Sequence, residues 1–392
     1  MKTRDTKNIT ICIPAYLEPK LLYTLKSLNK AESEGIEIKV LVLINNSENA
    51  DYLQKLQNLQ YFNDAKDWLN SYNGNLYFQI LLNQKLPHKY AGVGLARKIL
   101  GDKAAADFKV QNLNGIIVYL DADCIVSENY FQVISVYFET SSFNAASIRF
   151  EHQVSDLKIN TGIIEYESHL RYYILMQRYI GLPFATHTVG SSMAVLSDSY
   201  SSKGGMNKRK AGEDFYFLQK YIKDDECGIL TECCVYPSGR ISERVPFGTG
   251  RAMLNYEANN TFTWQTYNPK SFVILQLLIV NLEKVYITTF DLNRLNAQLR
   301  AFLDAIDFDK NLEQIRQNTT TYAAFKKRFF QYFDAFRLMK YLHYMRDEGG
   351  INDIPIIEGL KWYFENVPKE NHVLNPMESL RRLREIDNTY GN

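Results

Sequence analysis

The chain has 392 residues, enough for two or three domains and a sizeable hydrophobic core. Hydrophobic residues make up 46% and charged residues 23%, near the averages of soluble globular proteins, which excludes a disordered or low-complexity chain. The 45 basic and 44 acidic residues give a formal net charge of +1, without the large basic excess of a nucleic-acid binder. We therefore expect a folded protein that has no nucleic acid as its partner.

Short apolar runs alternate with segments of helical periodicity from residue 9 onward, which indicates β-α-β units around a mostly parallel sheet. The expected strands are Ile9–Ile13, Ile38–Ile44, Leu76–Leu82, Ile116–Leu120, Ala145–Phe150 and Ser191–Leu196. The expected helices are Leu21–Leu28, a polar stretch ending near Asn70, Ala91–Phe108, Gly162–Tyr179 and one that begins near Glu213. The pattern predicts an α/β domain over residues 1–260 and a mainly helical region over residues 261–392.

Aromatic residues, 13% of the chain, concentrate in the C-terminal region. Tyr322, Phe325, Phe329, Phe333 and Phe336 recur at helical spacing, with basic residues interleaved. A core helix and an amphipathic helix resting on an anionic membrane both fit this pattern. Aromatic stripes of this period are usually buried, so we favour the core helix and keep peripheral membrane contact as the alternative.

We expect neither an export signal nor a membrane-spanning segment. The apolar run Ile9–Ala15 contains Pro14 and is too short for a signal-peptide core. The longest apolar stretch, Phe272–Val280, is far below the ~20 residues of a membrane-spanning helix. The five cysteines are an odd number without a CxxC pair. We expect a cytoplasmic protein with reduced cysteines. The alternative is a cytoplasmic protein that contacts the inner face of the membrane.

Polar residues follow several of the expected strands. In an open α/β sheet, ligands bind beyond the carboxyl ends of the strands. Asp121 and Asp123 directly follow an apolar strand, where two carboxylates repel each other unless a cation or a donor lies between them. A divalent metal that also binds a nucleoside diphosphate is the natural partner. The alternative is a turn with two solvated aspartates.

Seven short motifs begin at Ile9 (ITICIPAYLE), Val40 (VLVLINNS), Gly92 (GVGLARK), Tyr119 (YLDAD), Gly190 (GSSMAV), Lys203 (KGGM) and Gly212 (GEDF). Their order, over roughly residues 9–220, resembles that of family 2 glycosyltransferases of the GT-A fold. The resemblance implies a GT-A fold with a Rossmann-like mixed sheet, followed here by the helical C-terminal region.

Several residues are implied to bind the donor. Pro14, Ala15, Tyr16 and Glu18 match the turn that surrounds the nucleoside. Asn46 stands where the family usually has an acidic residue that accepts a hydrogen bond from uracil. Because an amide can both accept and donate, the identity of the base is left open.

The diphosphate and its metal involve three further positions. Arg97 matches a basic residue near the diphosphate and base, although a solvent-facing helix arginine is the structural alternative. The resemblance implies that Asp121 binds the ribose or the metal and that Asp123 binds the metal. Mn²⁺ or Mg²⁺ would offset the charge of the leaving diphosphate.

Glu213 and Asp214 open a helix after Gly212, where acidic residues also complement the helix dipole. The resemblance implies that Asp214, with Glu213 beside it, is the general base that deprotonates the acceptor hydroxyl. In-line attack would then invert the anomeric carbon.

The acceptor is expected near Gly190, Ser191 and Ser192. His187, just ahead of them, is either part of this acceptor site or a structural histidine. Arg244 and Arg251 lie in a glycine-containing segment that would close over the diphosphate, unless it is a plain surface loop.

The sequence thus predicts a metal-dependent, inverting glycosyltransferase that uses a UDP- or GDP-type donor. A glycan or lipid-linked acceptor and a role in cell-surface glycan synthesis complete this prediction. A sugar-phosphate nucleotidyltransferase is a second candidate class, although the first strand leads into Pro14-Ala15-Tyr16 rather than a glycine-rich phosphate loop. A non-catalytic nucleotide-sugar-binding protein is the third.

Overall fold

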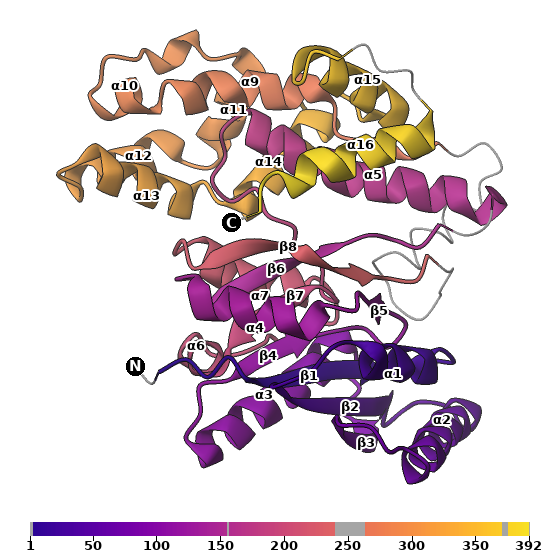
Figure 1. Ribbon diagram of the computed structural model, residues 1–392. Coiled ribbons are helices and arrows are strands. Elements are labelled where there is room, and N and C mark those ends of the chain that lie inside the picture. Colours follow the sequence, from indigo (N-terminus) through magenta and orange to yellow (C-terminus); the bar gives the residue numbers. More distant parts are fainter. Residues whose placement is uncertain (1–2, 155–156, 240–262, 371–374, 392) are drawn as a thin grey trace. The chain divides into compact units, whose positions relative to one another are not determined.

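The computed structural model describes residues 3–154, 157–239, 263–370 and 375–391 (Figure 1). The chain divides into two compact units. The first comprises residues 1–163, 188–258 and 388–392, and the second comprises residues 164–187 and 259–387. Most of the fifth helix, magenta in Figure 1, therefore belongs with the orange and yellow helices of the C-terminal region.

The first unit is built on a mixed sheet that has eight strands within the described residues. The strands are β1 (Asn8–Ala15), β2 (Glu37–Ser47), β3 (Tyr77–Leu86), β4 (Ile116–Tyr119), β5 (Ile125–Val126), β6 (Ala145–Phe150), β7 (Met193–Leu196) and β8 (Cys227–Tyr236). Their order is β3-β2-β1-β4-β7-β6-β8-β5. Strands β1 to β4 are mutually parallel, whereas β7 runs antiparallel to both β4 and β6. The predicted fold class, α/β with a Rossmann-like mixed sheet, is confirmed.

Helices cover both faces of the parallel half of this sheet. The helices of the first unit are α1 (Leu21–Lys30), α2 (Tyr52–Asn70), α3 (Val93–Gln111), α4 (Tyr130–Thr140), α6 (Ser197–Ser202) and α7 (Glu213–Ile222). Alternate residues of β1 and β2, such as Ile11 and Val42, form one core with Leu25 of α1 and Ala65 of α2. Helix α3 lies on the opposite face, because its Gly101 packs against the hydroxyl of Tyr119.

The second unit is almost entirely helical. Its helices are α5 (Leu157–Tyr179, from residue 164), α9 (Pro269–Val280), α10 (Leu282–Tyr286), α11 (Ala297–Ala305), α12 (Phe308–Gln317), α13 (Tyr322–Tyr332), α14 (Ala335–Asp347), α15 (Ile356–Asn366) and α16 (Pro376–Asn388). Side chains cap the N-termini of several of these helices. At α9, Asn268 accepts a hydrogen bond from the backbone N–H of Lys270, and at α14, Asp334 accepts one from that of Arg337. No helix in the described parts of the chain is long and apolar enough to cross a membrane.

The aromatic stripe of α13 faces the interior of the second unit. Phe325, Phe329 and Phe333 are fully buried, and their rings pack on one another along the helix. The interleaved Lys326 and Lys327 are exposed. This arrangement supports the core-helix interpretation of the stripe, because the same aromatic side chains cannot also insert into a lipid surface.

Candidate active site

The carboxyl ends of β1 and β2 lie side by side, as the parallel register requires. Ala15, the last residue of β1, pairs with Ile44, and the side chain of Asn45 donates from Nδ2 to the Ala15 carbonyl at 2.9 Å. Strand β4 pairs with the other side of β1, and the backbone N–H of Leu120 donates to the Cys12 carbonyl. The residues after these strands therefore meet at one edge of the sheet, where an open α/β fold binds its ligands.

A buried arginine joins two of the predicted site residues at this edge. Arg97, in the second turn of α3, donates from Nη1 to Glu213 at the start of α7 and from Nη2 to Asp121 after β4. The Arg97 and Glu213 side chains are 4% and 2% exposed, whereas that of Asp121 is 39% exposed. We call Arg97, Asp121, Glu213 and Asp214 the sheet-edge cluster. The solvent-facing alternative for Arg97 is wrong, since its side chain is buried among carboxylates.

Two glycines allow the approach of the segments that carry this cluster. A Cβ at Gly190 would collide with the guanidinium of Arg97. A Cβ at Gly94, in the first turn of α3, would collide with the backbone of Arg209 just before α7. Neither position leaves room for a side chain, and this close packing holds Arg97 against Glu213.

The charges of the cluster are unevenly matched. Burial lowers the pKa of Arg97, but the nearby carboxylates Asp121, Glu213 and Asp214 outweigh it and raise that pKa. Burial and the neighbouring Glu213 raise the pKa of Asp214 to about 6, against the opposing influence of Arg97. A carboxyl group with a pKa near neutrality is well suited to accept a proton from a substrate hydroxyl.

Asp121 and Asp123 remain the candidate metal ligands. Both lie just beyond the end of β4, after Leu120, and both side chains are partly exposed. No group of three or more metal-binding side chains occurs in the described residues. Two carboxylates fit a Mg²⁺ or Mn²⁺ ion whose remaining positions are filled by diphosphate oxygens and water, since such ions use one or two carboxylates plus phosphate.

The predicted donor-binding residues at the end of β1 and just beyond it lie close to the start of α1. Glu18 is 5% exposed, and its Oε1 accepts from the backbone N–H of Lys20 at 2.9 Å, next to the start of α1. Pro14 and Ala15 belong to β1, and Tyr16 is half-buried beyond the strand end. The structure thus gives Glu18 a local hydrogen bond, and its predicted role in donor binding stays a prediction.

The serines of the predicted acceptor region lie near the aspartates. Ser191 hydrogen-bonds to Cys124, the residue after Asp123, and this bond lowers the pKa of the Cys124 thiol against the larger effect of burial. Ser191 and Ser192 are buried, and the backbone carbonyl of Ser192 accepts from Ile148 in β6. Arg244 and Arg251 lie outside the described residues.

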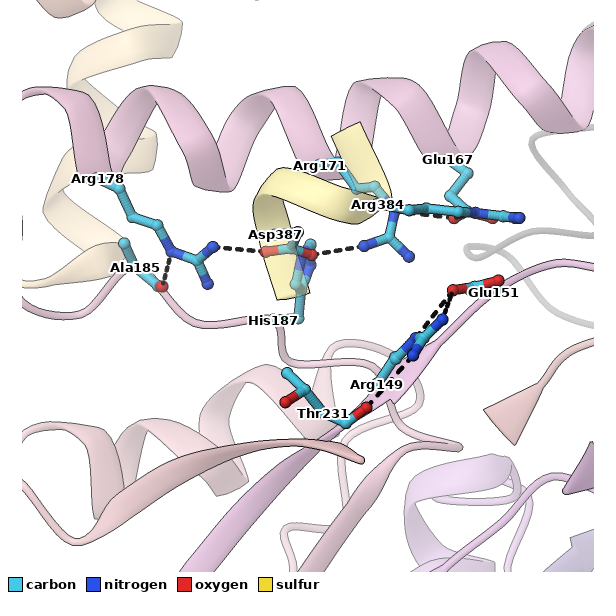
Figure 2. Close-up of polar contacts among 10 residues, drawn as sticks. All are labelled: Arg149, Glu151, Glu167, Arg171, Arg178, Ala185, His187, Thr231, Arg384 and Asp387. Carbon is cyan, nitrogen blue, oxygen red and sulfur yellow. Dashed lines mark hydrogen bonds and ion pairs between the residues drawn. The ribbon is translucent and has the colours of Figure 1, made fainter. Parts of the chain in front are cut away.

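His187 belongs to the second unit, where it enters a group of paired charges (Figure 2). Its Nε2 lies 2.9 Å from Oδ2 of Asp387 at the end of α16. Asp387 also pairs with Arg171 and Arg178 of α5, and Glu167 pairs with Arg171 and Arg384. We call these six residues the helical cluster. The contacts support the structural interpretation of His187. Figure 2 also draws Arg149, which pairs with Glu151 in the first unit.

Two groups of candidate residues were not anticipated. Lys208, Arg209 and Lys210 are exposed just before α7, and Arg209 lies against Gly94 at the sheet-edge cluster. Three consecutive basic residues shortly before the acidic pair are the signal that could have found them. Asn58, a buried amide on the inner face of α2, contacts Asn46. The sequence signal for Asn58 is a polar residue two helical turns before the buried Ala65.

No protein-family model matches the chain, and no curated protein matches it. Among solved structures, residues 1–349 of TarS from S. aureus in complex with UDP-GlcNAc share 13% identity, over 71% of this chain and 70% of that one, with a TM-score of 0.40. GalNAc-T7 with UDP, GalNAc and Mn²⁺ shares 15% identity, over 92% of this chain and 56% of that one, with a TM-score of 0.38. Similarity of this extent does not assign a function to the chain.

Proposed function

We propose that the chain is a metal-dependent, inverting glycosyltransferase that moves a sugar from a nucleoside-diphosphate donor to an acceptor hydroxyl. The observation that carries the proposal is the sheet-edge cluster. It joins the aspartate-containing turn after β4 to the acidic start of α7, with a carboxyl group of raised pKa beside them. The acceptor would be a glycan or a lipid-linked saccharide, in the synthesis of a cell-surface glycan.

Within the cluster, the chemistry assigns separate roles to Asp214 and Arg97. Asp214, mostly ionised at neutral pH, accepts the proton of the acceptor hydroxyl as its oxygen attacks the anomeric carbon. Attack opposite the departing diphosphate inverts that carbon. Arg97 is a positioning residue, because it holds Glu213 and Asp121 in fixed places on either side of its guanidinium.

Asp121 and Asp123 would hold the Mg²⁺ or Mn²⁺ ion together with the donor diphosphate. When bound, the ion supplies Lewis-acid stabilisation of the leaving diphosphate. The exposed Lys208, Arg209 and Lys210 add positive charge close to the same edge, where they would attract the anionic donor.

The decisive test is the substitution Asp214→Asn in the full chain. We expect turnover, measured as nucleoside diphosphate released from a panel of nucleotide sugars with an acceptor mixture, to fall by roughly 10²- to 10⁴-fold. Nucleotide binding, measured by calorimetry, should change little. Asp67→Asn, at an exposed position of α2, is the matched control.

Turnover that survives Asp214→Asn would remove Asp214 as the base. Nucleotide binding that is indifferent to Mn²⁺, or unchanged by Asp123→Ala, would contradict the proposed metal site. Pyrophosphate release from a nucleoside triphosphate and a sugar phosphate would favour the nucleotidyltransferase instead.

A further inference from the structure

Asn46 lies near the end of β2, and its side chain is fully buried. Its amide carries one oxygen that can accept hydrogen bonds and one NH₂ group that can only donate. A ligand at the carboxyl edge of the sheet would meet one or the other. Which of them remains available is determined by the hydrogen bonds around Asn58 of α2.

The backbone fixes the orientation of Asn58. The N–H of Leu17 donates to Oδ1 of Asn58 at 2.9 Å, and Nδ2 of Asn58 donates to the carbonyl oxygen of Asn45 at 2.8 Å. A backbone N–H can only donate and a carbonyl can only accept. The Asn58 amide therefore cannot be reversed without losing both bonds.

Asn58 in turn fixes the orientation of Asn46. The second N–H of Asn58 donates to Oδ1 of Asn46 at 3.0 Å. Reversing Asn46 would place two NH₂ groups against each other. The acceptor of Asn46 is thus engaged, while its Nδ2 has no hydrogen-bond partner within the described part of the chain. A buried donor without a partner is unfavourable, which is reason to look for a group that it binds.

The loop that links β1 to this amide pair has an unusual backbone. Leu17 has a φ of 50°, in the left-handed region that residues with a side chain seldom adopt. Its N–H is the group that orients Asn58. Because Nδ2 of Asn46 is covered in the ligand-free chain, a ligand must displace a neighbouring group to reach it. Strained backbone of this kind is common at binding sites.

We propose that Nδ2 of Asn46 donates to N3 of the base of the donor nucleotide, and that this selects cytosine over uracil. The proposal rests on the proposed function, because it requires a nucleoside diphosphate at this edge. Uracil carries a hydrogen on N3, whereas cytosine has a lone pair there. An acidic side chain would accept a hydrogen bond from N3–H of uracil. An amide whose oxygen is already engaged can instead donate to the lone pair on N3 of cytosine.

The test compares nucleotide binding by the full-length wild type and by Asn46→Asp. Aspartate has nearly the same shape, keeps an acceptor for Asn58, and replaces the donor Nδ2 with a second acceptor oxygen. Calorimetry with CDP, UDP, ADP and GDP in the presence of Mg²⁺ should show that the wild type binds CDP most tightly, roughly tenfold better than UDP. Asn46→Asp should reverse the order of CDP and UDP. Asn63→Asp, at an exposed position of α2, should leave it unchanged.

The wild-type measurement decides the proposal even if the variant fails to fold. Wild-type binding of UDP, ADP or GDP as tight as that of CDP would overturn it. A CDP-to-UDP ratio that Asn46→Asp leaves unchanged would also overturn it, because the amide would then have a purely structural partner such as water. Binding of none of the four nucleotides would overturn the proposed function as well.

Discussion

The two units each contain arginines buried against carboxylates, yet the two clusters differ in how the charges are matched. In the helical cluster, three arginines and His187 surround two carboxylates, and both oxygens of Glu167 and of Asp387 are paired. In the sheet-edge cluster, a single arginine pairs with two carboxylates and lies near a third, and Asp121 is substantially exposed.

The pKa values follow from this difference. Burial alone would raise the pKa of Asp387, but His187, Arg171 and Arg178 outweigh it and hold the pKa well below its usual value. Burial and Glu213 instead raise the pKa of Asp214 to about 6. A cluster with a surplus of carboxylates is poised to take up a proton or bind a cation, whereas one whose carboxylates are fully paired is suited to holding helices together.

The largest expected effect is on stability, in the helical cluster. Asp387→Ala would leave Arg171 and Arg178 without the carboxylate that they share, both in buried positions. Removing one partner of a buried ion pair costs about 3–5 kcal/mol. We expect a loss of this size in the free energy of unfolding, measured in urea by circular dichroism.

The control lies on the same helix. Glu385 is 65% exposed and pairs with Arg382, so Glu385→Gln should change the free energy of unfolding by less than about 1 kcal/mol. If Asp387→Ala changed the free energy of unfolding as little as Glu385→Gln, the ion pairs of the helical cluster would contribute far less to stability than their burial implies.

The next effect concerns the bridging role of Arg97. Lysine keeps the charge but has one nitrogen in place of a planar fork, so Arg97→Lys cannot hold both Glu213 and Asp121. Losing one charged hydrogen bond is expected to cost about 1.5–3 kcal/mol in unfolding free energy. Turnover should fall at least about tenfold, because the carboxylates are no longer held in place.

Arg346→Lys is the matched control, since Arg346 pairs with the exposed Asp347 on the surface of the second unit. Arg346→Lys should alter neither the free energy of unfolding nor turnover. Normal turnover in Arg97→Lys would show that the positive charge suffices and that the bridge does not position the site.

The sequence allowed the sheet edge to be predicted, but not its internal connections. Asp121 and Glu213 could be placed because each stands next to a clear pattern, an apolar strand and the start of a helix. They are linked through Arg97, which is 116 residues from Glu213 in sequence, and this link depends on tertiary packing that local periodicity does not encode. Strand β8 escaped prediction because Thr231 and Glu232 interrupt its apolar pattern, at a register shift against β6.

The boundaries of the second unit show a similar limit. Helix α5 was expected nearly in place, but the sequence pattern alone did not associate it with the C-terminal helices. That association depends on pairings such as Glu167 with Arg384, which are 217 residues apart. Apart from the aromatic stripe of α13, helices α9 to α16 were foreseen only as a helical region.

A third prediction uses the opposite pKa shifts of the two clusters. Asp214 has a raised pKa of about 6 in the folded chain against about 4 when unfolded. Its ionisation therefore lowers stability at neutral pH, and Asp214→Asn should be more stable than the wild type by roughly 1–3 kcal/mol at pH 7. This advantage should vanish as the pH falls from above 6 to below about 4.

Asp387 should show the reverse sign. Because its folded-state pKa is lowered, the stability that it contributes is fully present above about pH 4 and is lost as the pH falls further. Urea unfolding of wild type, Asp214→Asn and Asp387→Asn across this pH range gives the free energy of unfolding of each protein as a function of pH. Parallel curves for the two variants would mean that the clusters do not differ electrostatically.

The smallest expected effect tests how tightly the sheet-edge cluster is packed. Gly190→Ala would place a methyl group against the guanidinium of Arg97, which cannot swing away without releasing Glu213 or Asp121. Overpacking of this kind costs about 1–3 kcal/mol, and we expect the lower end because the contact is with the tip of a side chain. Urea unfolding measures the cost, and turnover should fall together with stability. If Gly190→Ala instead reduced only the affinity for acceptor, Gly190 would act in the predicted acceptor site and not through Arg97.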